Sequence, residues 1–174
     1  MYVSLDGVVE GPSWTGPYWN DQLSDMQEEY LYSSDALVLG RVTYEGFAAA
    51  WPSMEEGTGD FGRKMNSMCK HVASRTLPDA EWNATIIEGD VVAAVERLKS
   101  GSAGDLLIYG SGDLVDELTR HRLIDEYRLM VHPLLVGAGK KLFATVGETV
   151  PLKLDDTSTT DTGVAVLTYR LAEG

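Results

Sequence analysis

Short apolar runs alternate with helical patterns along the first two thirds of the chain. Apolar side chains at every third or fourth position predict helices, and short apolar runs bounded by polar or glycine residues predict buried strands. The predicted strands cover residues 2–5, 36–39, 70–74, 84–87 and 106–109. The predicted helices cover residues 21–33, 41–50, 61–68, 91–99 and 114–120, with a polar loop at 55–59. This alternation predicts an α/β fold with a mostly parallel central sheet.

The last third of the chain has a different pattern. Residues 126–132, 152–157 and 164–171 predict strands with little helix between them, which is typical of antiparallel pairing. The expected architecture is therefore a mostly parallel central sheet with flanking helices and an antiparallel C-terminal edge. Because we find no internal repeat, low-complexity tract or linker, we expect one domain over residues 1–174.

Composition narrows the class of protein. The chain has 174 residues, of which 44% are hydrophobic, so it is long enough to bury the core of one compact domain. Its single cysteine, Cys69, excludes an internal disulfide and a cysteine-rich zinc site, and it favours a reducing compartment. No apolar run reaches the length of a membrane span, and the N-terminus lacks a secretory leader pattern. We therefore expect a cytoplasmic protein with neither a membrane partner nor a metal site.

The charge balance limits the possible partners. A formal net charge of −13 would repel nucleic acid and anionic membranes, so neither is expected as a partner. A phosphorylated ligand would have to be held locally, by the few cations of the chain and by the positive ends of helices.

A glycine-rich turn at residues 110–112 connects the predicted strand at 106–109 to a helix. Its glycines let the backbone approach a ligand, and the first N–H groups of the next helix point toward an anion. The same pattern fits a tight connection without any ligand equally well. A second strand-to-helix junction contains Gly40, Arg41 and Thr43, and it strengthens the ligand interpretation.

A third segment follows the predicted strand at 70–74. Ser74 and Thr76 flank Arg75, and an arginine with two neighbouring hydroxyls suits a phosphate monoester. Strand-to-helix turns converge at the carboxyl edge of a parallel sheet, so we expect the three segments to lie together. A dinucleotide that carries an extra 2′-phosphate would use all three of them.

Five motifs of the chain, in this order and spacing, resemble the dihydrofolate reductase-like superfamily. They occupy residues 4–9, 39–45, 74–76, 108–112 and 133–143. The resemblance is closest to the riboflavin-biosynthesis reductase branch, the type found as the C-terminal domain of the bifunctional deaminase-reductase. It implies a three-layer α/β fold with flanking helices, NADPH as the hydride donor and a homodimer.

The resemblance also implies roles for particular residues. Ten residues would bind NADPH: Gly40, Arg41, Thr43, Ser74, Arg75, Thr76, Gly110, Ser111, Gly112 and Asp113. The segment around Arg75 would hold the 2′-phosphate, and the glycine turn would hold the pyrophosphate. Asp6 and Trp19 would bind the substrate, and Asp6 is equally well explained as a turn former beside Gly7.

Departures from the family patterns bear on the reaction. The chain lacks the His-x-Glu and Pro-Cys-x-x-Cys zinc site of a deaminase, so we expect no deaminase activity. The helix position that carries an acid in folate reductases falls at Ser24, beside Asp25. Tyr109 stands where the riboflavin branch tends to carry an acid.

The long loop over residues 6–20 is rich in glycine, proline and aromatic residues. Trp14, Tyr18 and Trp19 have the composition of a mobile lid over a flat heterocycle. In the alternative interpretation, these aromatic side chains cover the edge of the sheet or a dimer partner.

The expected function is an NADPH-dependent reductase of a planar nitrogen heterocycle, similar to 5-amino-6-(5-phosphoribosylamino)uracil reductase of riboflavin biosynthesis. The alternatives are a dihydrofolate or pterin reductase, and a non-catalytic nucleotide-binding module on the same fold. The proton donor stays unassigned, and its candidates are Asp6, Asp21, Asp25 and a pocket water. His71 and His132 are interpreted as ordinary strand residues without a catalytic role.

Overall fold

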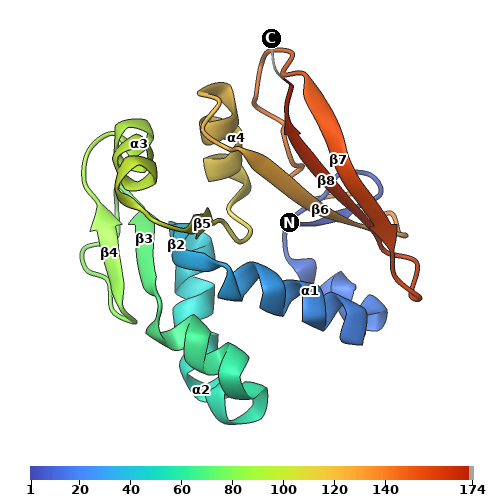
Figure 1. The fold of residues 1–174 in the computed structure, drawn as a ribbon, viewed down its shortest axis with the longest axis horizontal. Coiled ribbons are helices and arrows are strands. Elements are labelled where there is room, and N and C mark those ends of the chain that lie inside the picture. Colours follow the sequence, from blue (N-terminus) through green and yellow to red (C-terminus); the bar gives the residue numbers. More distant parts are fainter. Residues whose placement is uncertain (173–174) are drawn as a thin grey trace. The chain divides into compact units, whose positions relative to one another are not determined.

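The structure of the chain is a computed structural model that describes residues 1–172. The helices and strands drawn in Figure 1 belong to two compact units. The first unit contains residues 1–24 and the chain from Val115 onward, and the second unit contains residues 25–114. A single domain over residues 1–174 stays a prediction.

The second unit is built on a parallel four-stranded sheet. In spatial order, its strands are β4 (Ala84–Ile87), β3 (Cys69–Ala73), β2 (Ser34–Gly40) and β5 (Asp105–Leu107). Helix α2 (Arg41–Ser67) connects β2 to β3, and helix α3 (Val91–Gly101) connects β4 to β5. Parallel neighbours need such crossover connections, so the predicted alternation of strands and helices is present here.

The two helices cover opposite faces of this sheet. Side chains alternate between the faces of a strand, so Leu37 and Leu39 of β2 point one way and Ala36 points the other. Leu37 and Leu39 belong to a buried core with Tyr44 and Met65 of α2. Ala36 lines a hollow together with residues of α3. The sheet of this unit therefore lies between the two helices.

Helix α2 has the expected break between two helices, as a kink at Gly59 rather than as a loop over residues 55–59. Its 27 residues form two helical parts that meet at this kink, because Gly59, with φ 59° and ψ −130°, leaves helical geometry. The Asn66 side chain donates to the Trp51 carbonyl oxygen and to the Glu55 carboxylate, so the parts of the helix before and after Gly59 are bonded to each other. The polar side chains of the expected loop instead form a partly exposed helical surface.

The first unit contains the other four strands. They form one sheet in the order β1 (Tyr2–Ser4), β6 (Glu126–His132), β8 (Ala165–Leu171) and β7 (Leu152–Thr159). β1 is parallel to β6, whereas β6, β8 and β7 pair antiparallel, as predicted for the last third of the chain. The α/β fold with flanking helices is confirmed, and its strands are hydrogen-bonded as two sheets of four strands each.

Three more helices lie in the described chain. They are the 3-10 helix η1 (Pro12–Tyr18), α1 (Asp21–Tyr32) and α4 (Gly112–Arg120). The long loop expected over residues 6–20 therefore contains a short helix. None of the helices within residues 1–172 combines the length and the apolar character needed to cross a bilayer.

Candidate functional site

The three predicted phosphate-binding segments lie at one edge of the parallel sheet. β2 ends at Gly40, where it pairs with Ala73, the last residue of β3. Arg41 and Ser74, which follow these residues, therefore leave adjacent strands side by side. The turn after β5 reaches the same edge, because the Gly40 N–H donates to the Ser111 hydroxyl at 2.8 Å. The strand order thus brings together segments that lie far apart in the sequence.

The Ser111 hydroxyl joins the glycine turn to the start of α2. Its oxygen accepts from the Gly40 N–H, and its proton faces two acceptors, the Thr43 hydroxyl at 3.1 Å and the Tyr109 carbonyl oxygen at 3.2 Å. A hydroxyl has one proton to donate, so it serves one of these acceptors at a time. These bonds fix the turn against the end of β2 and the first turn of α2.

Glycine is favoured at position 110 for two reasons. The backbone there has φ 55°, in the left-handed region, and an added Cβ would lie 3.2 Å from the Thr43 hydroxyl oxygen. Ser111 follows with φ 63°, so two successive turn residues are left-handed. A side chain at position 110 would therefore strain the turn and press on Thr43.

The N-terminus of α2 is suited to an anion. Gly40 occupies the capping position and has no side chain to accept from the first N–H groups of the helix. These N–H groups lack partners within the helix and carry the positive end of its dipole. A Cβ on Gly40 would lie 3.3 Å from the Ser111 hydroxyl oxygen, so a glycine keeps this junction tight. Phosphate groups bind at helix ends of this kind.

Arg41 has a partner of its own on α2. Its guanidinium pairs with the Glu45 carboxylate at 3.0 Å, and the two side chains are 44% and 45% exposed. The sequence signal for such a pair is two opposite charges four residues apart on a helix. The expectation that Arg41 binds a phosphate does not take this ion pair into account. Arg41 would have to leave Glu45 in order to bind a phosphate.

The Ser74 hydroxyl shapes the turn that follows β3. Its oxygen accepts from the backbone N–H groups of Thr76 at 3.2 Å and Leu77 at 3.0 Å, a local bond that stabilises turns. Arg75, between them, is exposed, and within the described part of the chain its guanidinium forms no hydrogen bond or ion pair. Arg75 is therefore freer than Arg41 to pair with a phosphate.

Gly112 and Asp113 open helix α4. Asp113 is an exposed acid in the first turn, where a carboxylate stabilises the helix dipole. Because a carboxylate repels a phosphate, only the backbone of Asp113 suits a pyrophosphate. Of the ten predicted cofactor residues, Gly40 is the last residue of β2, and the other nine follow the carboxyl ends of β2, β3 and β5 in the second unit.

Comparisons with known proteins decide the family. The family model of the RibD C-terminal domain matches residues 1–167. The chain belongs to this family. It is 29% identical over 172 residues to the uncharacterized protein YyaP of Bacillus subtilis (strain 168), a match that covers 97% of this chain and 91% of YyaP.

Solved structures confirm the dihydrofolate reductase-like fold of this RibD C-terminal domain protein. A candidate riboflavin biosynthesis protein from Shewanella sp. PV-4 matches with a TM-score of 0.81 and 22% identity, covering 99% of this chain and 97% of that chain. Dihydrofolate reductase from Enterococcus faecalis, in complex with NADP(H), matches with a TM-score of 0.66 and 16% identity, covering 99% and 94%. The family model thus confirms the resemblance that the five motifs indicate, and the solved structures show the same fold.

Asp6, one of the two residues predicted to bind the substrate, has a structural role in the first unit. Its carboxylate accepts hydrogen bonds from the Ser4 hydroxyl at 2.6 Å and from the N–H groups of Val136 at 3.1 Å and Gly137 at 2.8 Å. These donors, the Ser4 hydroxyl above all, lower the pKa of Asp6 from 3.8 to about 2. Asp6 therefore stays ionised at neutral pH and holds the turn that follows β6.

Trp19, the other predicted substrate residue, is 44% exposed. Its indole N–H donates to the Ser24 hydroxyl at 2.9 Å, and its ring meets Tyr2 edge-on with 6.2 Å between centroids. Ser24, which the resemblance places where folate reductases carry an acid, accepts this hydrogen bond from Trp19. The exposed part of the indole is left for a ligand or a partner.

Trp14 and Tyr18 pack against His132, the last residue of β6. Their ring centroids lie 5.3 Å and 5.8 Å from that of the imidazole, and Tyr2 lies 5.8 Å from it. His132 is fully buried, and its Nδ1 lies 2.9 Å from the Met130 carbonyl oxygen, so we assign the proton of the neutral ring to Nδ1. His132 ends the strand as predicted, and it also anchors the aromatic loop, which no sequence signal indicates.

The other two candidate proton donors, Asp21 and Asp25, are exposed on α1. Asp21 lies in the first turn of the helix, where its charge stabilises the dipole. The buried face of α1 carries Leu23, Gln27 and Leu31, spaced four residues apart. Gln27 is a polar residue on this buried face, and its spacing with the two leucines predicts its burial.

Proposed function

We propose that this protein is an NADPH-dependent reductase of a planar nitrogen heterocycle. Its membership of the RibD C-terminal domain family supports an oxidoreductase of the riboflavin pathway type. The observation that carries the proposal is the single sheet edge at which the start of α2, the Ser111 turn and the Arg75 turn meet. These three segments supply helix N–H groups, a fixed glycine turn and an unpaired cation.

The residues at this edge fit a dinucleotide with an extra 2′-phosphate. The start of α2, with Gly40 in the capping position, would donate N–H groups to the pyrophosphate. Gly110 would keep the adjoining turn in place, since an added Cβ meets Thr43. Arg75 would pair with the 2′-phosphate. NADPH would supply the hydride, and the protein would bind and orient it.

The proton for the reduced product is proposed to come from Asp21, Asp25 or a pocket water. Asp6 is poorly suited, because a carboxyl group with a pKa of about 2 carries no proton at neutral pH. Its three hydrogen bonds also occupy its oxygens. We propose that Asp6 contributes by holding its turn in place.

The proposed substrate contact is Trp19. Its partly exposed indole suits the face of a flat heterocycle, since offset or edge-on contacts of aromatic rings are favourable. We also propose a cytoplasmic homodimer, in which the same indole is an alternative surface for the partner. Size-exclusion chromatography with light scattering tests the dimer independently of any ligand.

Calorimetry with NADPH and NADH tests the cofactor. We expect NADPH to bind more tightly, and equal affinities would contradict the proposed 2′-phosphate site. NADPH oxidation is then followed with ribosylaminopyrimidine, pterin and dihydrofolate acceptors. Turnover with dihydrofolate alone would identify a folate reductase, and binding without turnover on any acceptor would identify a nucleotide-binding module. The lack of deaminase activity stays a prediction for the same assays.

A further inference from the structure

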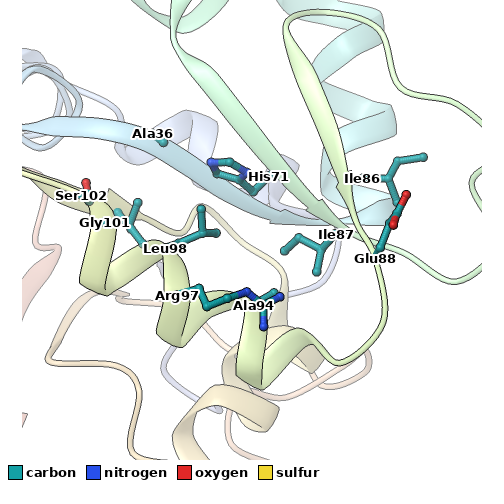
Figure 2. A pocket seen from close by; sticks show the side chains of 11 residues that line it. Ala36, His71, Ile86, Ile87, Glu88, Ala94, Arg97, Leu98, Gly101 and Ser102 are labelled. Carbon is teal, nitrogen blue, oxygen red and sulfur yellow. The ribbon is translucent and has the colours of Figure 1, made fainter.

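An open hollow of about 550 Å³ lies between helix α3 and the sheet of the second unit (Figure 2). Its floor includes the apolar side chains of Ala36 from β2, Ile87 from β4 and Leu106 from β5. Ala94 and Leu98 of α3 form the facing wall. The volume falls within the range of small-molecule sites. None of the ten predicted NADPH residues lines this hollow.

His71 of β3 lies at the hollow, between Ala36 and Ile87 (Figure 2). It is half-buried, and in the part of the chain that the structure describes its imidazole forms no hydrogen bond or ion pair. Burial lowers the pKa of His71 below its usual value of 6.5, so the ring is neutral at pH 7. A neutral imidazole offers a flat ring with one donor and one acceptor nitrogen to a ligand.

Arg97 supplies a cation at the rim. It projects from α3, it is exposed, and among residues 1–172 it has no ion-pair partner. Glu88 also borders the hollow, but its carboxylate points away from α3 (Figure 2). The rim therefore places an unpaired positive charge beside an apolar floor, on a chain whose net charge is −13.

We propose that this hollow binds a small aromatic carboxylate at a site separate from the NADPH site. The aromatic ring would cover the apolar floor and pack against the His71 imidazole, while the carboxylate would pair with the Arg97 guanidinium. This class of ligand uses both features of the hollow, since a neutral aromatic molecule leaves Arg97 unpaired and a small inorganic anion leaves the apolar floor uncovered.

NMR titration of the protein with 2-naphthoate tests this site. We expect a saturable shift of the His71 imidazole resonances, assigned by their loss in His71→Ala, with the resonances of buried His132 unmoved. Arg97→Gln should weaken binding roughly twofold to fivefold. Arg63→Gln, which removes an exposed arginine from α2, is the matched control and should change nothing. Uncharged 2-naphthylmethanol should bind more weakly than 2-naphthoate.

Two results would overturn the proposal. One is the lack of a saturable His71 shift, and the other is equal affinity of 2-naphthoate for the native protein and Arg97→Gln. NADPH calorimetry on Arg97→Gln separates this site from the proposed cofactor site. Unchanged NADPH affinity supports two sites, whereas loss of NADPH binding would overturn their separation.

Discussion

Different kinds of contact hold the predicted ligand-binding regions of the two units in place. In the second unit, the proposed cofactor edge is held by backbone groups and short hydroxyls, with Ser111 bonded to Gly40 at 2.8 Å and to Thr43 at 3.1 Å. In the first unit, the aromatic loop is held by rings, with Trp14 and Tyr18 at 5.3 Å and 5.8 Å from His132. The hydrogen bonds of the cofactor edge are directional, and its glycines lie too close to their neighbours for added atoms. The stabilisation that the ring contacts provide depends instead on the area that they bury.

This difference predicts opposite responses to mutation. An added side chain at the cofactor edge should abolish ligand binding and spare most of the fold, because the disturbed residues form a turn. A removed ring in the aromatic loop should lower stability and spare the cofactor edge, because the lost contacts are packing contacts. The following changes test the two halves of this contrast.

Gly110→Val should have the largest effect, a loss of NADPH affinity of at least a hundredfold. The valine would adopt a left-handed φ of 55° and push on the Thr43 hydroxyl, so the turn would move away from the start of α2. Calorimetry measures the loss, and circular dichroism checks the fold. Gly46→Ala is the control, since a Cβ there meets nothing within 4 Å. Normal NADPH binding by Gly110→Val would show that the turn is only a connector.

His132→Ala should lower the free energy of unfolding by about 2 to 3 kcal/mol, because it leaves a cavity among three aromatic rings. Denaturant unfolding measures the change, and NADPH affinity should stay the same. His121→Ala is the matched control, since His121 is an exposed residue near Glu117. A tenfold loss of NADPH affinity in His132→Ala would contradict the contrast between the two regions.

Arg75→Ala should remove most of the preference for NADPH over NADH, a change of roughly ten- to a hundredfold. A charge-assisted hydrogen bond is worth about 1.5 to 3 kcal/mol. Only NADPH has the 2′-phosphate that would form this bond, so the substitution should weaken NADPH binding and leave NADH binding unchanged. Calorimetry with both nucleotides measures the ratio, with Arg63→Ala as the control. An unchanged ratio would place the 2′-phosphate elsewhere.

Asp6→Asn should change how stability depends on pH. The pKa of Asp6 is lowered from 3.8 to about 2 in the folded protein, so its ionised form stabilises the fold above about pH 4. That contribution is lost as the pH falls from 3.8 toward 2. Melting temperatures between pH 7 and pH 2 should show a smaller acid-induced decrease in Asp6→Asn than in the native protein. Parallel pH curves for the two proteins would contradict the structural role of Asp6.

Glu45→Gln should have the smallest effect, a gain in NADPH affinity of roughly twofold to fivefold. The substitution frees Arg41 from an exposed ion pair, and such pairs are worth at most about 1 kcal/mol. Calorimetry at low and high salt measures it, and the gain should shrink as salt screens the charge. A loss of affinity would show that Glu45 orients Arg41 for the phosphate.

Much of the fold could be predicted from local patterns. The strands at 84–87 and 126–132 have the predicted bounds, because short apolar runs between polar residues mark them directly. The expected break between two helices is present at Gly59, but residues 55–58 are helical and not a loop, since polar residues and glycines occur on an exposed helical surface as well as in loops. Asn66, which bonds to Glu55 and Trp51, is a distant partner that a local window does not include.

The candidate site could be predicted in part. The ten predicted cofactor residues lie at or just after the ends of adjacent strands. They could be predicted because each segment has its own local signature of glycine, hydroxyl or arginine. His71 and Arg97 escaped prediction, since a lone histidine in a strand and a lone arginine on a helix have no distinctive spacing. Their shared hollow exists only where α3 faces the sheet.

The sequence by itself determined the order of strands and helices and the chemistry of each turn. Apolar periodicity, glycine positions and neighbouring hydroxyls act over a few residues, so they can be interpreted without a structure. Only the tertiary structure decided which turns meet, such as Gly40 with Ser111, 71 residues further along the chain. It also decided that the ring of Trp14 packs against His132. Contacts between such distant residues depend on strand order and packing, which no local pattern encodes.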